Sequence, residues 1–293
     1  MFKTIRSWIK KEAKTEPVLS TPSQNTKKDQ QSRPSEEQTG ALIYSSRTDT
    51  GLQRDHNEDS TFSLSLRLSH NNVTLPAGLF IVADGLGGHE SGEVASEIAV
   101  RTVSRMLLQR LFLQFLDYPP QAPSVSIQDA IKETVDEANR LIFQDIPGGG
   151  TTLTAALILG SQLTLAQIGD SRAYWLSDEG EIRPLTRDHS LVGHLLEAGQ
   201  ITPEEALQHP QRNILYRALG QATPVEVDLT TLPLPGSGHL ILCSDGLWGV
   251  LPPTQIASII QTASHVTTAT LELIRAANAA GGPDNISVIL VRI

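Results

Sequence analysis

Three aspartates border apolar, β-branched runs of the chain, where a strand end would hold each carboxylate rigidly. Asp84 and Asp245 each follow such a run, and Asp284 comes just before another. Carboxylates that converge from separate strand ends can bind hard divalent cations, which prefer oxygen ligands. This pattern predicts a metal-dependent hydrolase.

A charged segment at residues 51–59 adds further candidates. Arg54 could bind a phosphate in a bidentate manner, because guanidinium has a fork geometry and stays charged. Glu58 and Asp59 point to opposite sides if the backbone is extended, so that one could reach a metal while the other orients a metal-bound water. Taken alone, such a charged run is more often a solvated turn.

A glycine-rich loop follows Asp84 and ends at His89. Its glycines allow a close approach of the backbone, and the carbonyl of Gly85 could serve as an extra oxygen ligand. A glycine-rich loop before a helix could also hold nucleotide phosphates. That alternative is weak, because the loop has neither the P-loop nor the dinucleotide-binding glycine spacing.

One more aspartate and an asparagine lie in turn-like segments. Asp170 is predicted in a turn between two strands, and Asn285 could orient its neighbours, including Asp284, from outside the ligand set. Each such motif alone could be a turn in which the aspartate caps its own backbone. Five of them in one chain are hard to explain as turns.

The expected ligand set is carboxylate and carbonyl oxygen. The eight histidines lack a zinc-binding spacing, and Cys243 is the only cysteine. Oxygen ligands favour Mg²⁺ or Mn²⁺. The lone cysteine also excludes an intrachain disulfide and is typical of a reducing compartment, so we expect a cytoplasmic protein.

Charge is divided unevenly along the 293 residues. The net charge is −9, with +3 on residues 1–45 and −12 on the remainder. An acidic body argues against a nucleic-acid substrate. No apolar run approaches the roughly 20 residues of a membrane span.

The first 45 residues are predicted to be a disordered basic and polar tail, because they contain few apolar residues. Residues 1–11 could form a short membrane-surface or partner-docking helix, although a frayed terminus is the simpler interpretation. A single folded domain is expected from residue 46 to residue 293.

Strands and helices alternate in blocks within this domain, which indicates antiparallel sheets packed between helical layers. Strands are predicted at 79–83, 152–159, 163–168, 172–177, 239–243 and 286–292, and helices at 92–116, 127–144, 254–263 and 267–280. Residues 190–220 form a helical insertion that could be a mobile flap over a site or a plain surface excursion. Its predicted helices start at Thr202 and at Arg212.

Taken in order, these motifs resemble the metal-dependent serine/threonine protein phosphatases of type 2C, the PPM family, in its bacterial branch. The resemblance covers residues ~46–293. Its motifs are Arg54-x-x-Asn57-Glu58-Asp59, Asp84-Gly85-x-Gly87-Gly88-His89, Gly150-Thr151-Thr152, Gly169-Asp170-Ser171-Arg172, Leu185-Thr186-x-Asp188-His189-Ser190, Ala218-Leu219-Gly220, Ser244-Asp245-Gly246 and Asp284-Asn285.

The resemblance implies an α+β fold, a four-layer αββα sandwich of two antiparallel sheets flanked by helices, with a small helical flap at about 190–220. It also implies two or three Mn²⁺ or Mg²⁺ ions at one end of the sheets. Asp59, Asp84, the carbonyl of Gly85, Asp245 and Asp284 would bind two ions, Asp170 with Asp245 a third, and Arg54 the substrate phosphate.

The implied reaction is hydrolysis of phosphoserine and phosphothreonine in proteins by a metal-bridging hydroxide, without a phosphoenzyme. Animal members carry a histidine as general acid where this chain has Leu86, so His89 or a metal-bound water is expected in that role. The expected partners are protein substrates of bacterial serine/threonine kinases, and we expect a monomer. One alternative is a catalytically silent module that keeps the fold; another is a phosphatase regulating an anti-anti-sigma-type switch.

Overall fold

The computed structural model of the chain describes Ser7 and residues 42–70, 73–87, 90–117, 123–202, 205–206 and 209–293. The predicted tail therefore lies almost wholly outside the described residues, as does the helix predicted at residues 1–11 apart from Ser7. The first described strand begins at Ile43, within the last residues of the range assigned to the tail.

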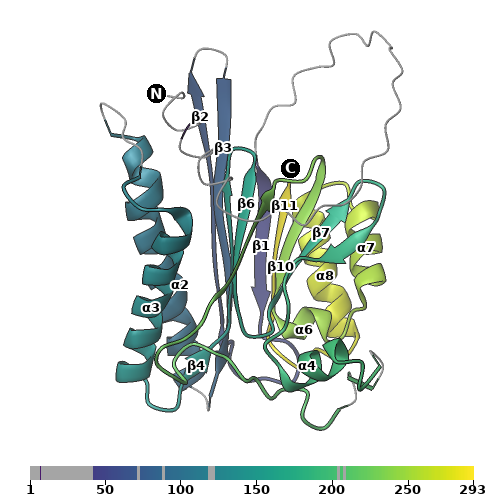
Figure 1. Cartoon of the computed structure of the whole chain (residues 1–293). Coiled ribbons are helices and arrows are strands. Elements are labelled where there is room, and N and C mark those ends of the chain that lie inside the picture. The colour runs from purple at the N-terminus through teal and green to yellow at the C-terminus, as the bar shows by residue number, and fades with distance from the viewer. Residues whose placement is uncertain are drawn as a thin grey trace.

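The domain is built on two antiparallel sheets that pack face to face (Figure 1). The first sheet has the strand order β1 (Ile43–Asp49), β11 (Ile286–Arg292), β10 (Gly238–Cys243), β7 (Arg172–Ser177) and β8 (Ile182–Pro184). The second has the order β2 (Asp59–His70), β3 (Val73–Leu86), β5 (Leu153–Leu159), β6 (Gln162–Ile168) and β9 (Asp228–Pro233), and β4 (Gly150–Thr151) pairs with the end of β3.

Helices cover the outer face of each sheet, which gives four layers (Figure 1). The helices α2 (Glu90–Leu107) and α3 (Ile127–Asp145) cover the second sheet, and α7 (Pro253–Thr262) and α8 (Val266–Ala279) cover the first. The predicted αββα sandwich is confirmed. Among the described residues, no helix has the length and apolarity needed to cross a membrane.

Side-chain alternation in the strands explains this layering. On β3, Leu79 and Ile81 face the core beneath α2 and α3, whereas Phe80 and Val82 face the core between the sheets. All four are fully buried. A strand that is apolar on both faces is expected where layers cover a sheet on both sides, and this accounts for the continuous apolar runs in the sequence.

The predicted strands are all present, but five strands were not predicted: β1, β2, β4, β8 and β9. The predicted helix at 92–116 is shorter than expected, because α2 ends at Leu107 and is followed by a π-helical turn and a 3₁₀ turn up to Phe115. Ser126 caps α3 by accepting a hydrogen bond from the Asp129 N–H at 3.0 Å.

The described part of the predicted insertion at 190–220 includes the helix α4 (Leu191–Glu197). Thr202 and Glu205 exchange the two hydrogen bonds of a capping box, as the helix start predicted. The short helix predicted from Arg212 is wrong. That segment instead forms isolated bridges, with Leu215 pairing with Ser190 and Leu219 with Thr151, and these backbone pairings replace helical hydrogen bonds.

Candidate metal centre

The strand register of the β2–β3 hairpin places two of the predicted ligands side by side. Asp59, the first residue of β2, is the direct cross-strand partner of Asp84. Side chains of such partners leave the sheet on the same face with Cβ atoms roughly 4.5–5.5 Å apart. The two carboxylates therefore share one end of the sandwich, where strand ends, β4, α4 and α6 (Asp245–Trp248) meet (Figure 1).

Gly85 follows Asp84 in a space that no side chain could enter. A Cβ at this position would lie 2.3 Å from the carbonyl oxygen of Gly92 and 2.7 Å from that of Glu58. The carbonyl of Asp84 accepts hydrogen bonds from the Thr152 N–H at 2.9 Å and from the Thr151 hydroxyl at 2.8 Å. These contacts fix the backbone that carries the Asp84 carboxylate.

The other sheet supplies Asp245 at the start of α6. Ser244, which precedes it, donates its hydroxyl to Oδ2 of Asp59 at 2.8 Å and so joins the two sheets at the site. Gly246 is pressed against the next loop, since a Cβ there would lie 2.0 Å from the carbonyl oxygen of Asn285. Close backbone packing thus brings the loops that carry Asp245 and Asp284 together.

Asn285 fastens the charged segment to the same end of the sandwich. Its side-chain amide donates to the carbonyls of Thr50 and His56 at 2.9 and 2.8 Å, and its Oδ1 accepts from the Glu58 N–H at 2.8 Å. The Glu58 side chain lies against Gly92, where an added Cβ would be 2.5 Å from Oε2. Asp59 faces Ser244 instead, so the adjacent carboxylates lie on opposite sides of the strand, as predicted.

Arg54 lies at the rim of this cluster. Its Nη2 donates to Oδ2 of Asp284 at 2.7 Å, and the arginine side chain is 49% exposed. Asp170 reaches the cluster from the turn between β6 and β7, and the flap residue Arg212 is close enough to lower the pKa of Asp245. The structure therefore brings Arg54 and all five predicted aspartates to one end of the molecule.

The carboxylates repel one another in a poorly hydrated place. Burial, more than repulsion from Asp245, raises the pKa of Asp59 to about 7. Burial and repulsion from Asp284 raise the pKa of Asp245 to about 6. Burial and neighbouring carboxylates likewise hold the pKa values of Asp84 and Asp170 well above the usual range.

Two buried carboxylate oxygens have no hydrogen-bond donor among the described residues: Oδ1 of Asp59 and Oδ1 of Asp245. Buried polar atoms are nearly always paired, so these oxygens are suited to accept a cation as their partner. Within the described ranges, no three acidic, histidine or cysteine side chains already surround one cation position. The oxygen donors and uncompensated negative charge still fit divalent cations, with the carbonyl of Gly85 and water completing each set.

Comparisons with known proteins agree with this geometry. Residues 55–279 match the family model of protein phosphatase 2C. The chain is 40% identical over 251 residues to a serine/threonine phosphatase of Listeria monocytogenes, covering 84% of this chain and 93% of that protein.

This chain belongs to the protein phosphatase 2C family.

Solved structures of similar phosphatases have the same fold. The serine/threonine phosphatase of S. agalactiae superposes with a TM-score of 0.70 at 35% identity, covering 86% of this chain and 99% of that chain. The catalytic domain of the phosphatase PstP in complex with two manganese ions gives a TM-score of 0.67 at 32% identity, covering 86% and 98%. The predicted fold, family and phosphoprotein phosphatase activity are confirmed, as is metal dependence at the level of the family.

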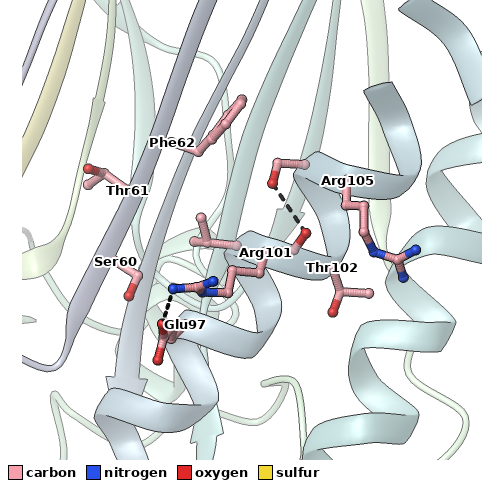
Figure 2. A pocket seen from close by; sticks show the side chains of 9 residues that line it. Ser60, Thr61, Phe62, Glu97, Arg101, Thr102 and Arg105 are labelled. Atoms are coloured by element: carbon pink, nitrogen blue, oxygen red, sulfur yellow. Dashed lines mark hydrogen bonds and ion pairs between the residues drawn. The ribbon is translucent and has the colours of Figure 1, made fainter. Parts of the chain in front are cut away.

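The phosphatase has a groove of about 700 Å³ between β2 and α2, but no predicted metal ligand lines it (Figure 2). Ser60, next to Asp59, faces α2 and lies 3.0 Å from the Ser96 hydroxyl, whereas Asp59 faces the other way. The only carboxylate lining the groove, that of Glu97, pairs with Arg101 at 2.6 Å. Cavity size therefore does not locate the candidate centre.

One predicted catalytic residue, His89, lies outside the described residues together with Gly88. The sequence also contained residues whose contacts were not foreseen. Ser244 and Thr152 belong to the quoted motifs and Trp248 lies two residues after one of them, yet only the folded chain shows that they hold the acidic residues in place. In the sequence, only their position in or near the motifs and their small or aromatic side chains indicate such a role.

Proposed function

We propose that this phosphatase hydrolyses phosphoserine and phosphothreonine in proteins with the help of two or three Mn²⁺ or Mg²⁺ ions. It is a serine/threonine protein phosphatase of the 2C family, like its relatives in Listeria and S. agalactiae. The observation that carries the metal proposal is the pair of buried, unpaired oxygens of Asp59 and Asp245 amid carboxylates of raised pKa.

The ions would be held by oxygen atoms from both sheets. The proposed donors are the carboxylates of Asp59, Asp84, Asp245 and Asp284 and the carbonyl of Gly85, with Asp170 and Asp245 holding a third ion. When bound, such ions supply Lewis-acid chemistry: they polarise phosphoryl oxygens and lower the pKa of water. The chain contributes the spacing of the ligands, which Ser244 and the threonines at 151 and 152 fix.

Arg54 is the proposed phosphate-binding residue. Its guanidinium is half-exposed at the rim, and among the described residues only one of its five N–H donors has a partner, the Asp284 carboxylate. A bidentate contact to two phosphoryl oxygens would orient the substrate and balance the charge that spreads over them in the transition state. Glu58 and Asn285 would act indirectly, by orienting water and the loop that carries Arg54.

Cys243 is excluded as a nucleophile. It is fully buried in β10, and burial raises the pKa of its thiol to about 12, so the reactive thiolate is essentially absent at neutral pH. The general acid for the leaving alkoxide stays a prediction, with His89 as the candidate residue. Whichever group acts as the general acid, the proposed reaction needs no covalent phosphoenzyme.

The test compares three full-length proteins on p-nitrophenyl phosphate with Mn²⁺, with Mg²⁺ and with EDTA. Asp84→Asn should lower kcat by at least about 10²-fold, because loss of one preorganised electrostatic contact costs that much in other enzymes. Its thermal transition should stay cooperative. Asp145→Asn, an exposed change at the end of α3, is the matched control and should behave as wild type.

Wild-type protein that is inactive with both ions, together with an unaltered Asp84→Asn variant, would contradict the proposal and favour a silent binding module. Cooperative unfolding that disappears in Asp84→Asn would assign this residue to structure instead.

We also propose that the substrates are those of serine/threonine kinases, that the protein is monomeric, and that it acts in the cytoplasm. The single, buried Cys243 supports a reducing compartment. Phosphoproteomics of a deletion strain would identify the substrates, because their serine and threonine phosphorylation should rise. Size-exclusion chromatography with light scattering would test the monomer.

A further inference from the structure

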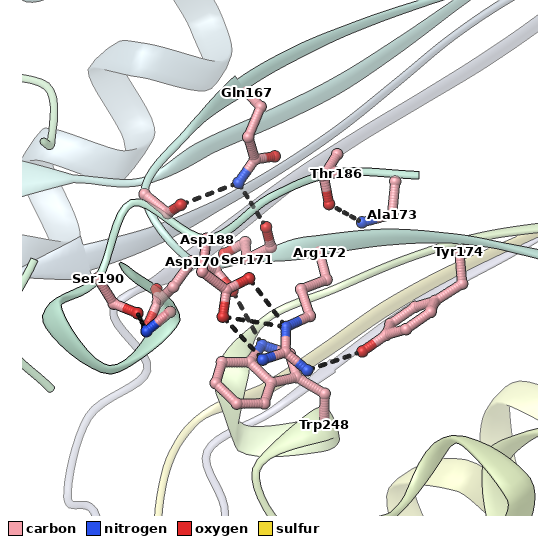
Figure 3. Close-up of polar contacts among 12 residues, drawn as sticks. Gln167, Asp170, Ser171, Arg172, Ala173, Tyr174, Thr186, Asp188, Ser190 and Trp248 are labelled. Atoms are coloured by element: carbon pink, nitrogen blue, oxygen red, sulfur yellow. Dashed lines mark hydrogen bonds and ion pairs between the residues drawn. The ribbon is translucent and has the colours of Figure 1, made fainter. Parts of the chain in front are cut away.

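Arg172, the first residue of β7, contacts three other side chains through its guanidinium (Figure 3). Its Nε and Nη2 donate to Oδ1 and Oδ2 of Asp188 at 2.9 and 2.7 Å, and its Nη1 donates to the Tyr174 hydroxyl at 3.0 Å. The guanidinium carbon lies 3.5 Å from the centre of the Trp248 ring. The proposed reaction uses none of these four side chains.

Trp248 connects the two acidic loops next to this arginine. It is the last residue of α6, the helix that begins with Asp245, and its indole N–H donates to the backbone carbonyl of Asp170 at 3.0 Å. The Asp170 and Asp245 carboxylates repel each other, and after burial this repulsion does most to raise the pKa of Asp170. The indole therefore ties together two loops whose charges would otherwise separate them.

Asp188 connects the same arginine to the base of the flap. It directly precedes His189, whose N–H donates to the carbonyl of Gly169 at 2.9 Å. The next residue, Ser190, caps α4. The Asp188 side chain is only 9% exposed, so its charge needs the bidentate partner. Arg172 thus contacts Asp188, just before the flap, on one side and Trp248, which bridges the acidic loops, on the other.

We propose that Arg172 is a positioning residue that sets the separation of Asp170 and Asp245 for a divalent cation and links it to the base of the flap. The inference rests on the proposed function. The planar fork of arginine makes the paired contact to Asp188 and the flat stacking on Trp248 at the same time. Lysine carries the same charge but can make only one of these contacts.

Two variants of the full chain separate the two contacts. Arg172→Lys removes the fork and the stacking surface, whereas Trp248→Phe keeps an aromatic ring but removes the N–H that reaches Asp170. Arg292→Lys is the matched control, because Arg292 also contacts both carboxylate oxygens of an aspartate, Asp178, away from the candidate centre.

The first readout is Mn²⁺ affinity, measured by isothermal titration calorimetry without substrate. Arg172→Lys and Trp248→Phe should each weaken the lowest-affinity binding event by about 10–100-fold, the usual effect of removing a residue that orients a ligand. The double variant should bind Mn²⁺ only slightly more weakly than Arg172→Lys alone, because both changes disrupt the same chain of contacts from Arg172 through Trp248 to Asp170. Arg292→Lys should stay within about twofold of wild type.

The second readout is the change in tryptophan emission when Mn²⁺ is added. If Arg172 only stabilised the fold, the variants would not differ in this change as described below. The chain has three tryptophans, and Trp175 lies in the core between the sheets, on the face of β7 opposite Tyr174. Mn²⁺ should change the emission of wild type and of Arg292→Lys. The change should shrink in Arg172→Lys and vanish in Trp248→Phe.

If Arg172→Lys binds Mn²⁺ at every site as tightly as wild type, the inference is overturned and the proposed function stands. The same holds if Arg292→Lys loses as much Mn²⁺ affinity as Arg172→Lys. If Arg172→Lys does not fold, the Mn²⁺ affinity of Trp248→Phe is compared with wild type in its place. A wild-type chain that binds no Mn²⁺ at all would overturn the inference and the proposed function together.

Discussion

At the scale of single residues, the acidic site works against the stability of the fold. The carboxylate of Asp59 is nearly buried, and one of its oxygens has no donor among the described residues. Desolvation disfavours its charged form, which is why its pKa rises to about 7. A protein that keeps such a group needs it for something other than folding, and cation binding supplies the reason.

Asp59→Asn should therefore stabilise the ion-free protein, and the effect should depend on pH. A raised pKa means that the stability contributed by the protonated acid is present below the unfolded value of 3.8 and is lost as pH rises through about 7. In EDTA at pH 8, we expect Asn to raise the free energy of unfolding by about 2–4 kcal/mol, given roughly 1.4 kcal/mol per pKa unit.

Urea unfolding at pH 5 and pH 8 would measure this, with the exposed Asp145→Asn as control. At pH 5 the advantage of Asp59→Asn should fall to about 1–2 kcal/mol, because the carboxyl is ionised in the unfolded chain, with a pKa of 3.8, and must take up a proton on folding. It should disappear only below pH 3.8. An equal advantage at both pH values would show that burial does not penalise the charge of this aspartate.

At the scale of elements, apolar patterning predicts the strands of the interior but not those of the edges. The run at Leu79–Val82 is apolar on both faces and could only be a covered strand. β2 alternates at Phe62, Leu64 and Leu66, but serines separate these residues, so β2 has no continuous apolar run of the kind that predicts the interior strands. β8 has three residues, too few to show any period.

The apolar pattern of the sequence does not predict the strand register on which the candidate site depends. Asp59 and Asp84 are adjacent only because the β2–β3 hairpin pairs them directly, and a slip by one residue would put the two side chains on opposite faces of the sheet. The motifs identify each acidic residue separately. That these residues converge at one end of the molecule follows only from the strand order and from the contacts of Ser244 and Asn285.

The contact between α6 and the loop before β11 gives a prediction at the same scale. Gly246→Ala would place a Cβ 2.0 Å from the carbonyl oxygen of Asn285, so the two segments must move apart. We expect a loss of about 2–4 kcal/mol in urea unfolding, the range of severe single substitutions. Gly236→Ala is the control, because no atom lies within 4 Å of its added Cβ; equal stability of the two variants would argue against tight packing at Gly246.

At the scale of the whole molecule, the folded body is anchored at its beginning by Leu42. This side chain is buried between the sheets, and its carbonyl accepts a hydrogen bond from the Ser65 hydroxyl at 3.0 Å. Deleting residues 1–40 keeps both contacts, so kcat on p-nitrophenyl phosphate should stay within about twofold of the full chain. A large loss of kcat would show that the first 40 residues belong to the catalytic domain.

The acidic charge of the body links cation binding to pH. Burial and mutual repulsion raise the pKa values of Asp59 and Asp245 to about 7 and about 6, so both carboxyl groups are largely protonated at pH 5.5 without ions. Cations bind the carboxylate form, so binding must displace these protons. Mn²⁺ affinity should therefore increase between pH 5.5 and pH 7.5, and protons should be released at the lower pH. Calorimetry in two buffers of different ionisation enthalpy measures that release directly, and Asp59→Asn should release fewer protons than wild type. An affinity that is constant over this range, without proton release, would mean that the cations bind elsewhere on the molecule.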